Sequence, residues 1–285
     1  MAAKYVLFGL IVFAFGLSPA HAQENPPQAE ALPESTKPWA LTLTLDVPTA
    51  YFFRGYNQED SGCILQPAVT FSYTVFSSED LSITPYVTTW NSIHETKSPQ
   101  SPKHWFESDV IGGTKFAYRQ FTLDVYYTHY IYPGSIAGDI DEIGATLSYD
   151  DSDWATSCNL PFSFQPYVSY WREVSDENGD QDTSMEVGIK PAFDIPDTQF
   201  TVVIPVAVGL SPDGFYLDSS GNNEAFGYAS IGAIVSHPLP IPEQYGKWTI
   251  SAGVQYLYLE ADSLRTVNNG THNQFIGKLS VAAEF

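Results

Sequence analysis

Strict alternation of apolar and polar residues is the feature that most constrains this chain. In the segment 41–47 every odd residue is Leu or Val, and every even residue is Thr or Asp. The segment 121–128 repeats the pattern, with Phe, Leu, Val and Tyr at its odd positions. Successive side chains of a strand point to opposite faces, so this pattern predicts sheets with one apolar and one polar face. No segment shows a convincing helical period, and we therefore predict an all-β fold.

The length and number of these segments predict the architecture. Twelve of them follow one another: 39–54, 63–76, 80–91, 104–118, 121–132, 140–149, 161–172, 183–194, 199–209, 225–236, 247–259 and 272–285. Most are longer than the ~5–6 residues of globular strands and match the ~9–11 that cross a bilayer at a tilt. Long and short connections largely alternate, as in membrane barrels. We predict a transmembrane antiparallel β-barrel of about 12 strands over residues 39–285.

Aromatic spacing supports the membrane assignment. Trp248 and Tyr258 share a parity and lie ten residues apart, and so do Phe275 and Phe285. At ~3.3 Å per residue and a tilt near 40°, ten residues rise about 25 Å, which is the distance between the two aromatic girdles of a barrel.

The N-terminal residues predict export. One basic residue, Lys4, precedes the apolar run 5–16, and Ala20-His21-Ala22 has the form of a cleavage site. We predict a cleaved signal peptide at 1–22 and a disordered Pro- and Glu-rich periplasmic leader at 23–38. The chain carries 12 Lys and Arg against 33 Asp and Glu, a net charge of −21. That acidity excludes nucleic acid as a partner. We predict the outer membrane of a Gram-negative bacterium as the location, with membrane lipid, lipopolysaccharide and the barrel assembly machinery as partners.

Two motifs resemble a known family. Tyr51-Phe52-Phe53-Arg54-Gly55-Tyr56-Asn57-Gln58 resembles the Y-x-F-R-G-x-x-Q signature of the TorF-type porins, which are bacterial outer-membrane barrels. The strand 142–149, Glu-Ile-Gly-Ala-Thr-Leu-Ser-Tyr, resembles the E-I-x-x-x-L-S-Y strand of that family. The terminal Phe285 resembles the signal that outer-membrane barrels present for assembly. The resemblance implies a barrel and its location more than any transported solute.

If the apolar parity faces lipid, the opposite parity lines the lumen. The predicted lumen and selectivity residues are Asp46, Arg54, Glu107, Asp109, Lys115, Asp124, Glu142, Arg172, Glu186, Lys190 and Lys278. A two-residue turn at Arg119-Gln120 places Lys115 opposite Asp124, Phe116 opposite Leu123 and Val110 opposite His129. Arg54 has two interpretations: a residue of the pore field, or an interfacial anchor that pairs with an acid such as Asp60.

Acids exceed bases in this set, so we predict a porin-like channel for small hydrophilic solutes with a weak cation preference. Two alternatives stay open: a plugged structural barrel, since side chains fill a narrow barrel, and a surface-exposed binding or adhesin protein without transport. A secreted β-sandwich is the rival from another fold class.

Other chemistry has little support in the sequence. Neither G-x-S-x-G nor H-E-x-x-H occurs, and the six His are scattered, so we predict no enzyme and no cofactor. The acidic loop 176–182 lacks the spacing of a calcium loop, and we interpret it as a solvated charge run that binds divalent ions weakly at most. The topology places Cys63 and Cys158 at opposite ends of the barrel, which predicts two free thiols.

Overall fold

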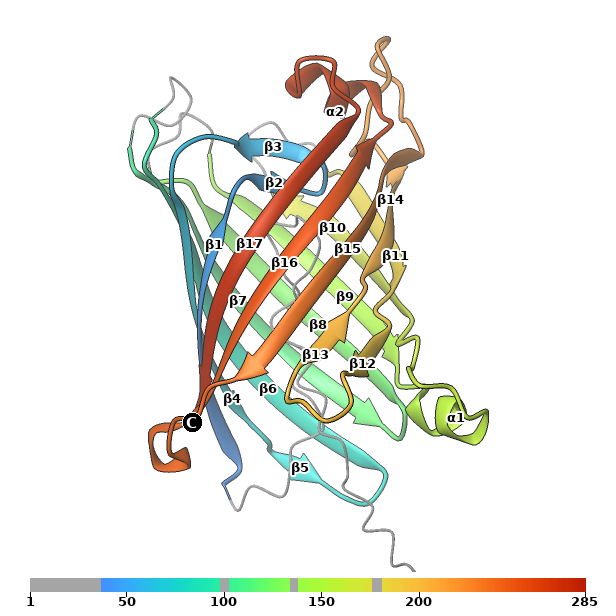
Figure 1. Cartoon of the computed structure of the whole chain (residues 1–285). Coiled ribbons are helices and arrows are strands. Elements are labelled where there is room, and N and C mark those ends of the chain that lie inside the picture. Colours follow the sequence, from blue (N-terminus) through green and yellow to red (C-terminus); the bar gives the residue numbers. More distant parts are fainter. Residues whose placement is uncertain (1–36, 98–102, 134–137, 176–180) are drawn as a thin grey trace, which may run out of the picture.

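A closed antiparallel barrel forms the molecule (Figure 1). The computed structural model describes residues 37–97, 103–133, 138–175 and 181–285, so the predicted signal peptide and nearly all of the predicted leader lie outside it. Twelve long strands make up the ring within the described residues: β1 (Trp39–Pro48), β4 (Ile64–Tyr73), β6 (Leu81–His94), β7 (Trp105–Tyr118), β8 (Phe121–Ile131), β9 (Ile140–Tyr149), β10 (Tyr167–Ser175), β11 (Thr183–Ile189), β14 (Val206–Asp213), β15 (Phe226–Pro238), β16 (Lys247–Leu259) and β17 (Asn273–Glu284). The predicted fold class is confirmed.

Each long strand pairs with the next, and β1 pairs with β17 to close the ring. Closure excludes the β-sandwich, in which two open sheets pack face to face. The predicted two-residue turn is confirmed, because Tyr118 pairs with Phe121 around Arg119-Gln120. The same ladder places Lys115 opposite Asp124 and Val110 opposite His129, as the parity predicts.

Proline interrupts two of the predicted strands. The segment 183–194 is divided into β11 and the short β12 (Ala192–Asp194) at Pro191, and 199–209 into β13 (Thr201–Val203) and β14 at Pro205. Proline has no N–H to donate to the ladder, so regular pairing stops beside it. The short β5 (Phe76–Ser77) pairs with the start of β6.

The polarity of the barrel is the reverse of that of a soluble protein. On β8, Leu123, Val125 and Tyr127 are 40 to 45% exposed, whereas the alternate residues Asp124 and Thr128 are at most 4% exposed. The outer face is therefore apolar and the inner face polar, which is the pattern of a membrane barrel. Within the part of the chain that the structure describes, no helix is long and apolar enough to cross a membrane.

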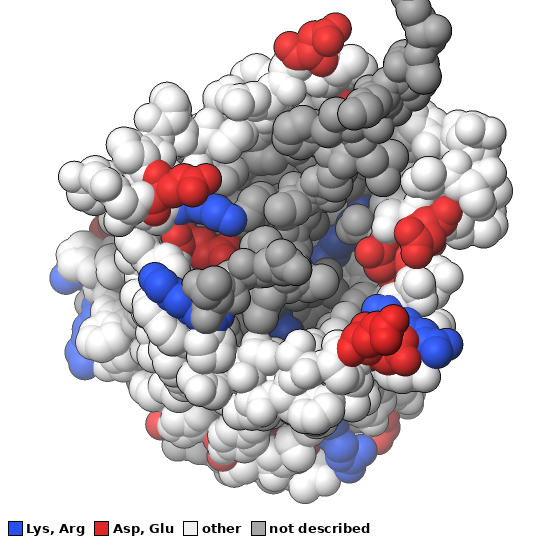
Figure 2. Space-filling model, turned by 90° about the horizontal axis from the view of Figure 1, so that it is seen from below, with Lys and Arg blue, Asp and Glu red and all other residues white. Residues whose placement is uncertain are grey.

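The two ends of the barrel differ. The described chain starts and finishes at one end, where α1 (Ser152–Ser157) and the 3₁₀ turn η1 (Glu243–Tyr245) occupy the two longer connections of that side (Figure 1). Seen from this end, the wall is a ring on which acidic and basic side chains lie beside one another (Figure 2). The other end carries long connections and α2 (Asp262–Val267).

Aromatic side chains meet near both ends of the last two strands. Trp248 and Phe285 lie with ring centroids 6.5 Å apart near the end of the C-terminus, and Tyr256 and Phe275 are 5.2 Å apart near the other end. Of the predicted girdle residues, Trp248 and Tyr258 have the outward parity of β16 and Phe275 that of β17, as the girdles require.

Candidate functional site: the lumen and its inward hairpin

The inward parity of the strands brings the predicted lumen residues together. Nine of them are buried and polar: Asp46, Arg54, Glu107, Asp109, Lys115, Asp124, Glu142, Glu186 and Lys190. Lys278 has the same parity on β17, and its Nζ donates to Asp46 Oδ2 at 2.9 Å. Ten of the eleven therefore lie inside the ring.

Arg172 does not, and its predicted place in the lumen is wrong. On β10 the odd residues Tyr167, Ser169 and Trp171 are buried, so the even residue Arg172 falls on the outer face, where it is exposed. It donates to Gln181 at 3.1 Å instead of entering the lumen. Trp171 is the inward side chain at this height, and its Nε1 donates to Tyr126 Oη at 2.7 Å.

The first predicted strand ends early, and the chain folds inward. The segment 39–54 was expected to be one strand, but β1 stops at Pro48 and is followed by a separate hairpin of β2 (Tyr51–Phe53) and β3 (Tyr56–Glu59). Arg54 and Gly55 form its turn, with φ of +46° and +90°. Positive φ at both central residues belongs to the tight type I′ turn. We call β2, β3 and this turn the inward hairpin.

Arg54 ties the inward hairpin to the far wall. Its two terminal nitrogens donate to both carboxylate oxygens of Glu142 at 2.6 and 2.7 Å, and Nη1 also donates to Ser184 Oγ at 2.9 Å. Glu142 is on β9 and Ser184 on β11, the strands on either side of β10, which is six places from β1 in the ring of twelve. The hairpin therefore reaches across the lumen. Pairing of Arg54 with Asp60 at the interface is wrong, because the turn carries Arg54 inward.

The surroundings of Arg54 keep it charged. Its guanidinium is 4.1 Å from the ring centre of Trp171 and 4.6 Å from that of Phe53, and the residue is 1% exposed. Burial by itself lowers the pKa of this group, but the Glu142 carboxylate outweighs that effect and raises the pKa above its ordinary value. The planar guanidinium of arginine suits this site, because it can make two parallel hydrogen bonds to a carboxylate while aromatic rings lie against it.

A second set of contacts anchors the base of the hairpin. Tyr51 Oη donates to Glu107 Oε2 on β7 at 2.5 Å. Burial raises the pKa of the Tyr51 hydroxyl well above its usual range, and the nearby Glu107 adds to the effect. Tyr51 therefore keeps its proton and remains a donor. Tyr56 Oη donates to the Phe215 carbonyl at 2.7 Å, on the opposite side of the hairpin.

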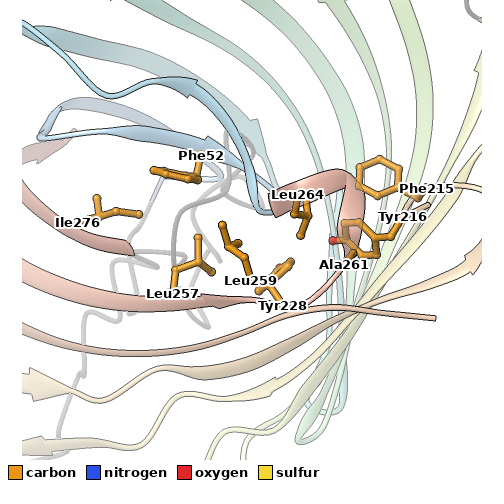
Figure 3. Packing of buried hydrophobic residues seen from close by; sticks show 9 residues of the cluster. All are labelled: Phe52, Phe215, Tyr216, Tyr228, Leu257, Leu259, Ala261, Leu264 and Ile276. Atoms are coloured by element: carbon orange, nitrogen blue, oxygen red, sulfur yellow. The ribbon is translucent and has the colours of Figure 1, made fainter. Parts of the chain in front are cut away.

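An apolar cluster fills the lumen beside the hairpin (Figure 3). Its buried members come from the hairpin, the 215–216 loop, the adjoining strands and α2: Phe52, Phe215, Tyr216, Tyr228, Leu257, Leu259, Ala261, Leu264 and Ile276. Leu264 of α2 packs against Gly55, since a Cβ there would lie 2.7 Å from Leu264 Cδ1. The hairpin and α2 together narrow the end of the barrel that carries the long connections.

Other lumenal charges have partners on neighbouring strands. Lys115 faces Asp124 across β7 and β8, Tyr86 Oη donates to Asp124 Oδ1 at 3.1 Å, and Lys115 Nζ is 5.3 Å from the Tyr86 ring centre. Glu186 accepts from Tyr167 at 2.6 Å and from Tyr228 at 2.5 Å.

Sequence reasoning missed the tyrosines and Trp171 as partners of these charges. Inward parity marks each of them, but the inward turn of the hairpin has only one local signal. That signal is Gly55, which accepts a positive φ, between the aromatic residues Phe53 and Tyr56.

The remaining predicted features fall in loops. Cys63 and Cys158 are both exposed and free, as predicted. Residues 176–180 of the acidic loop lie outside the described residues. Among the residues that the structure does describe, no group of three or more His, Cys, Asp or Glu is placed to hold a metal ion.

Comparison with solved structures finds other outer-membrane barrels that resemble this one. An outer-membrane channel from Pseudomonas putida F1 superposes with a TM-score of 0.51 at 8% identity, over 92% of this chain and 100% of that one. The NanC porin gives a TM-score of 0.40 at 12% identity over 86% and 98% of the two chains. The translocator domain of the autotransporter NalP from Neisseria meningitidis gives 0.40 at 11% identity over 89% and 91%. At these identities the Pseudomonas channel supports the fold alone.

No curated protein matches the sequence. A family model described as a bacterial protein of unknown function, Gcw_chp, matches residues 32–210, which include the inward hairpin and the strands that hold Arg54. The chain belongs to this Gcw_chp family of bacterial proteins.

Proposed function

We propose that this chain is an outer-membrane, porin-like channel through which small hydrophilic solutes diffuse passively, with a weak preference for cations. The observation that carries the proposal is the reversed polarity of a closed barrel. Its outer face is apolar, and its inner face carries both carboxylates and cationic side chains. An apolar exterior needs lipid, and a charged interior needs water or counter-charges.

The location rests on several supports. The aromatic pairs near both ends of β16 and β17 suit a membrane band, and the N-terminal residues have the composition of a cleaved signal peptide. Resemblance of the Tyr51–Gln58 motif to the TorF-type porins agrees with this location. Lipid, lipopolysaccharide and the assembly machinery are then the partners, and no enzymatic step is part of the proposal.

The cation preference rests on the charge of the lumen. The buried carboxylates on the strands are Asp46, Glu107, Asp109, Asp124, Glu142 and Glu186, and they outnumber the buried cations Arg54, Lys115 and Lys190. A low-dielectric wall concentrates the field of such charges, which attracts cations and repels anions.

Planar-bilayer recording of the purified chain tests this function. We expect stable conductance in KCl and a reversal potential, under a salt gradient, that shows K⁺ passing more readily than Cl⁻. A chain that folds, as judged by heat-modifiable migration on a gel, but gives no conductance contradicts the channel. A preference for Cl⁻ contradicts the assignment of selectivity to the lumenal acids.

The inward hairpin supports a second candidate, a barrel that it plugs. Arg54 spans the lumen, and an apolar cluster packs beside it. The double replacement Arg54→Met and Glu142→Gln removes the ion pair that attaches the hairpin to the far wall, and it leaves no single charge buried alone. If the hairpin only constricts the channel, the wild type conducts and this variant conducts more. If the hairpin plugs the barrel, the wild type is closed and only the variant conducts. The pair Arg119→Gln with Asp80→Asn, an exposed ion pair outside the lumen, is the matched control.

A further inference from the structure

Asp109 differs from the other carboxylates inside the barrel. It is 0% exposed, and neither of its carboxylate oxygens has a hydrogen-bond partner among the described residues. Every other buried carboxylate on the strands accepts at least one hydrogen bond or faces a cation, as Glu107 does from Tyr51 and Asp124 from Tyr86. A buried carboxylate without a partner is costly, so its surroundings must supply a compensating group.

Two further acids surround Asp109. Glu107 lies two residues away on β7 and shares its inward face, about 7 Å along the strand. Tyr130 of β8 is directly opposite Asp109 in the ladder, and its Oη donates to Glu142 Oε1 on β9 at 3.0 Å. Arg54 is committed to Glu142 and neutralises one of these three carboxylates. Glu107 and Asp109 therefore remain as two neighbouring carboxyl groups that no salt bridge among the described residues neutralises.

The lysine of β7, Lys115, does not neutralise Glu107 and Asp109. Lys115 has the inward parity of β7 but lies six residues from Asp109, about 20 Å along the strand, and it faces Asp124. The oxygen-bearing groups next to Asp109 are the Glu107 carboxyl, whose Oε2 accepts from Tyr51, and Tyr130, which is opposite Asp109 in the ladder. Such hard oxygen donors are typical ligands of Ca²⁺ and Mg²⁺ rather than of softer metals.

We propose that Glu107 and Asp109 together bind a hard divalent cation inside the barrel, next to the inward hairpin. Two carboxylates match the charge of one such ion. Among the described residues no three acidic, histidine or cysteine side chains converge on a common point, so the protein supplies only part of the coordination shell and water supplies the rest, as Ca²⁺ tolerates. The site goes beyond the proposed channel function, because it can be occupied whether or not solutes pass.

Terbium luminescence tests the site on the full chain in detergent micelles. Tb³⁺ replaces Ca²⁺ at oxygen sites and emits when a nearby aromatic ring absorbs light, and Trp90 lies opposite Asp109 in the β6–β7 ladder. We expect a sensitised signal that Ca²⁺ displaces. Asp109→Asn should weaken the tightest phase of binding by about tenfold or more, since half of the protein carboxylates are lost.

Asp141→Asn is the matched control. Asp141 precedes Glu142 on β9 but has the outward parity, where Tyr127 and His129 hydrogen-bond to it. This variant should bind Tb³⁺ as the wild type does, and carboxylates in the outer loops contribute equally to all variants. If Asp109→Asn does not fold, Glu107→Gln takes its place and should show the same loss.

Two results overturn the proposal. One is equal binding by the wild type, Asp109→Asn and Glu107→Gln. The other is a wild-type signal that Ca²⁺ does not displace, because terbium would then not occupy a site that takes Ca²⁺. Conductance is measured separately, so a chain that binds Ca²⁺ but does not conduct refutes the channel and leaves this site intact.

Discussion

Arg54 shows how much one side chain can organise inside a narrow barrel. Its backbone is left-handed, with φ of +46°, which is uncommon for a residue other than glycine. The bidentate pair with Glu142 and the faces of Trp171 and Phe53 hold it there. Strain of about 1–3 kcal/mol is tolerated when the surroundings over-determine a conformation, and it is concentrated at functional sites. Its contacts therefore hold Arg54 inside the barrel rather than at its surface.

Lys115 and Asp124 provide a test at the same scale. We expect a double-mutant cycle of Lys115→Met and Asp124→Asn, measured by urea unfolding in lipid vesicles, to give a coupling of about 1–3 kcal/mol. Each single variant leaves one charge buried without its partner, whereas the double variant leaves none. A cycle of Lys115 with Asp46, which is on a distant strand beside Lys278, should be additive. Additive effects for Lys115 and Asp124 would show that the facing charges do not interact.

The inward hairpin is the element that separates this barrel from an unobstructed ring. None of the twelve long strands needs it for pairing, since β2 and β3 pair only with each other. Its position depends on side chains: Arg54 and Tyr51 contact the wall, and Gly55 packs beneath α2. The hairpin is thus a separately attached unit, and its docking can be weakened without opening the ladder of the barrel.

Gly55 tests that attachment. Alanine at Gly55 would place its Cβ 2.7 Å from Leu264 Cδ1 on a backbone with φ of +90°. We expect Gly55→Ala to lower the free energy of unfolding by about 1–3 kcal/mol. Gly112→Ala is the control, because no atom lies within 4 Å of its Cβ position and its strand conformation accepts any residue. That change should stay within about 0.5 kcal/mol. Equal urea midpoints for the two variants would mean that the turn does not require glycine.

The whole molecule has two chemically distinct ends joined by an apolar wall. Cys63 lies in the connection between β3 of the inward hairpin and β4, and Cys158 directly follows α1, which is at the same end of the barrel as the C-terminus. The buried carboxylates of the strands lie in the lumen, and most exposed aromatic and aliphatic side chains of the strands lie on the outer face. In the proposed membrane location these two ends lie in different compartments.

Cysteine labelling measures which end of the barrel faces the outside of the cell. In intact cells we expect a bulky, membrane-impermeant maleimide to modify Cys63, on the outer side, and to reach Cys158 only after the cells are permeabilised. Cys63→Ser should abolish labelling of intact cells, whereas Cys158→Ser should leave it unchanged. Preferential labelling of Cys158 in intact cells would reverse the proposed orientation, and labelling of both would argue against a membrane between them.

The sequence by itself determined the barrel, its strands and most of its inner face. Alternation is a local property, and a side-chain period of two carries parity along a strand without knowledge of the partner. Ladders such as Lys115 with Asp124 followed from parity and a two-residue turn. Parity also shows why Arg172 was misplaced, since Tyr167 and Arg172 cannot both point inward on a regular strand.

Only the tertiary structure decided which residues the Tyr51–Gln58 motif contacts. Contacts of Arg54 with Glu142 and Ser184 join residues 88 and 130 positions apart, and they depend on which strands close the ring opposite β1. The lack of a hydrogen-bond partner for Asp109 among the described residues also depends on the closed ring, because the partners of a buried charge come from every strand around it. Local periodicity reports the face on which a residue lies, whereas closure of the barrel determines what it meets there.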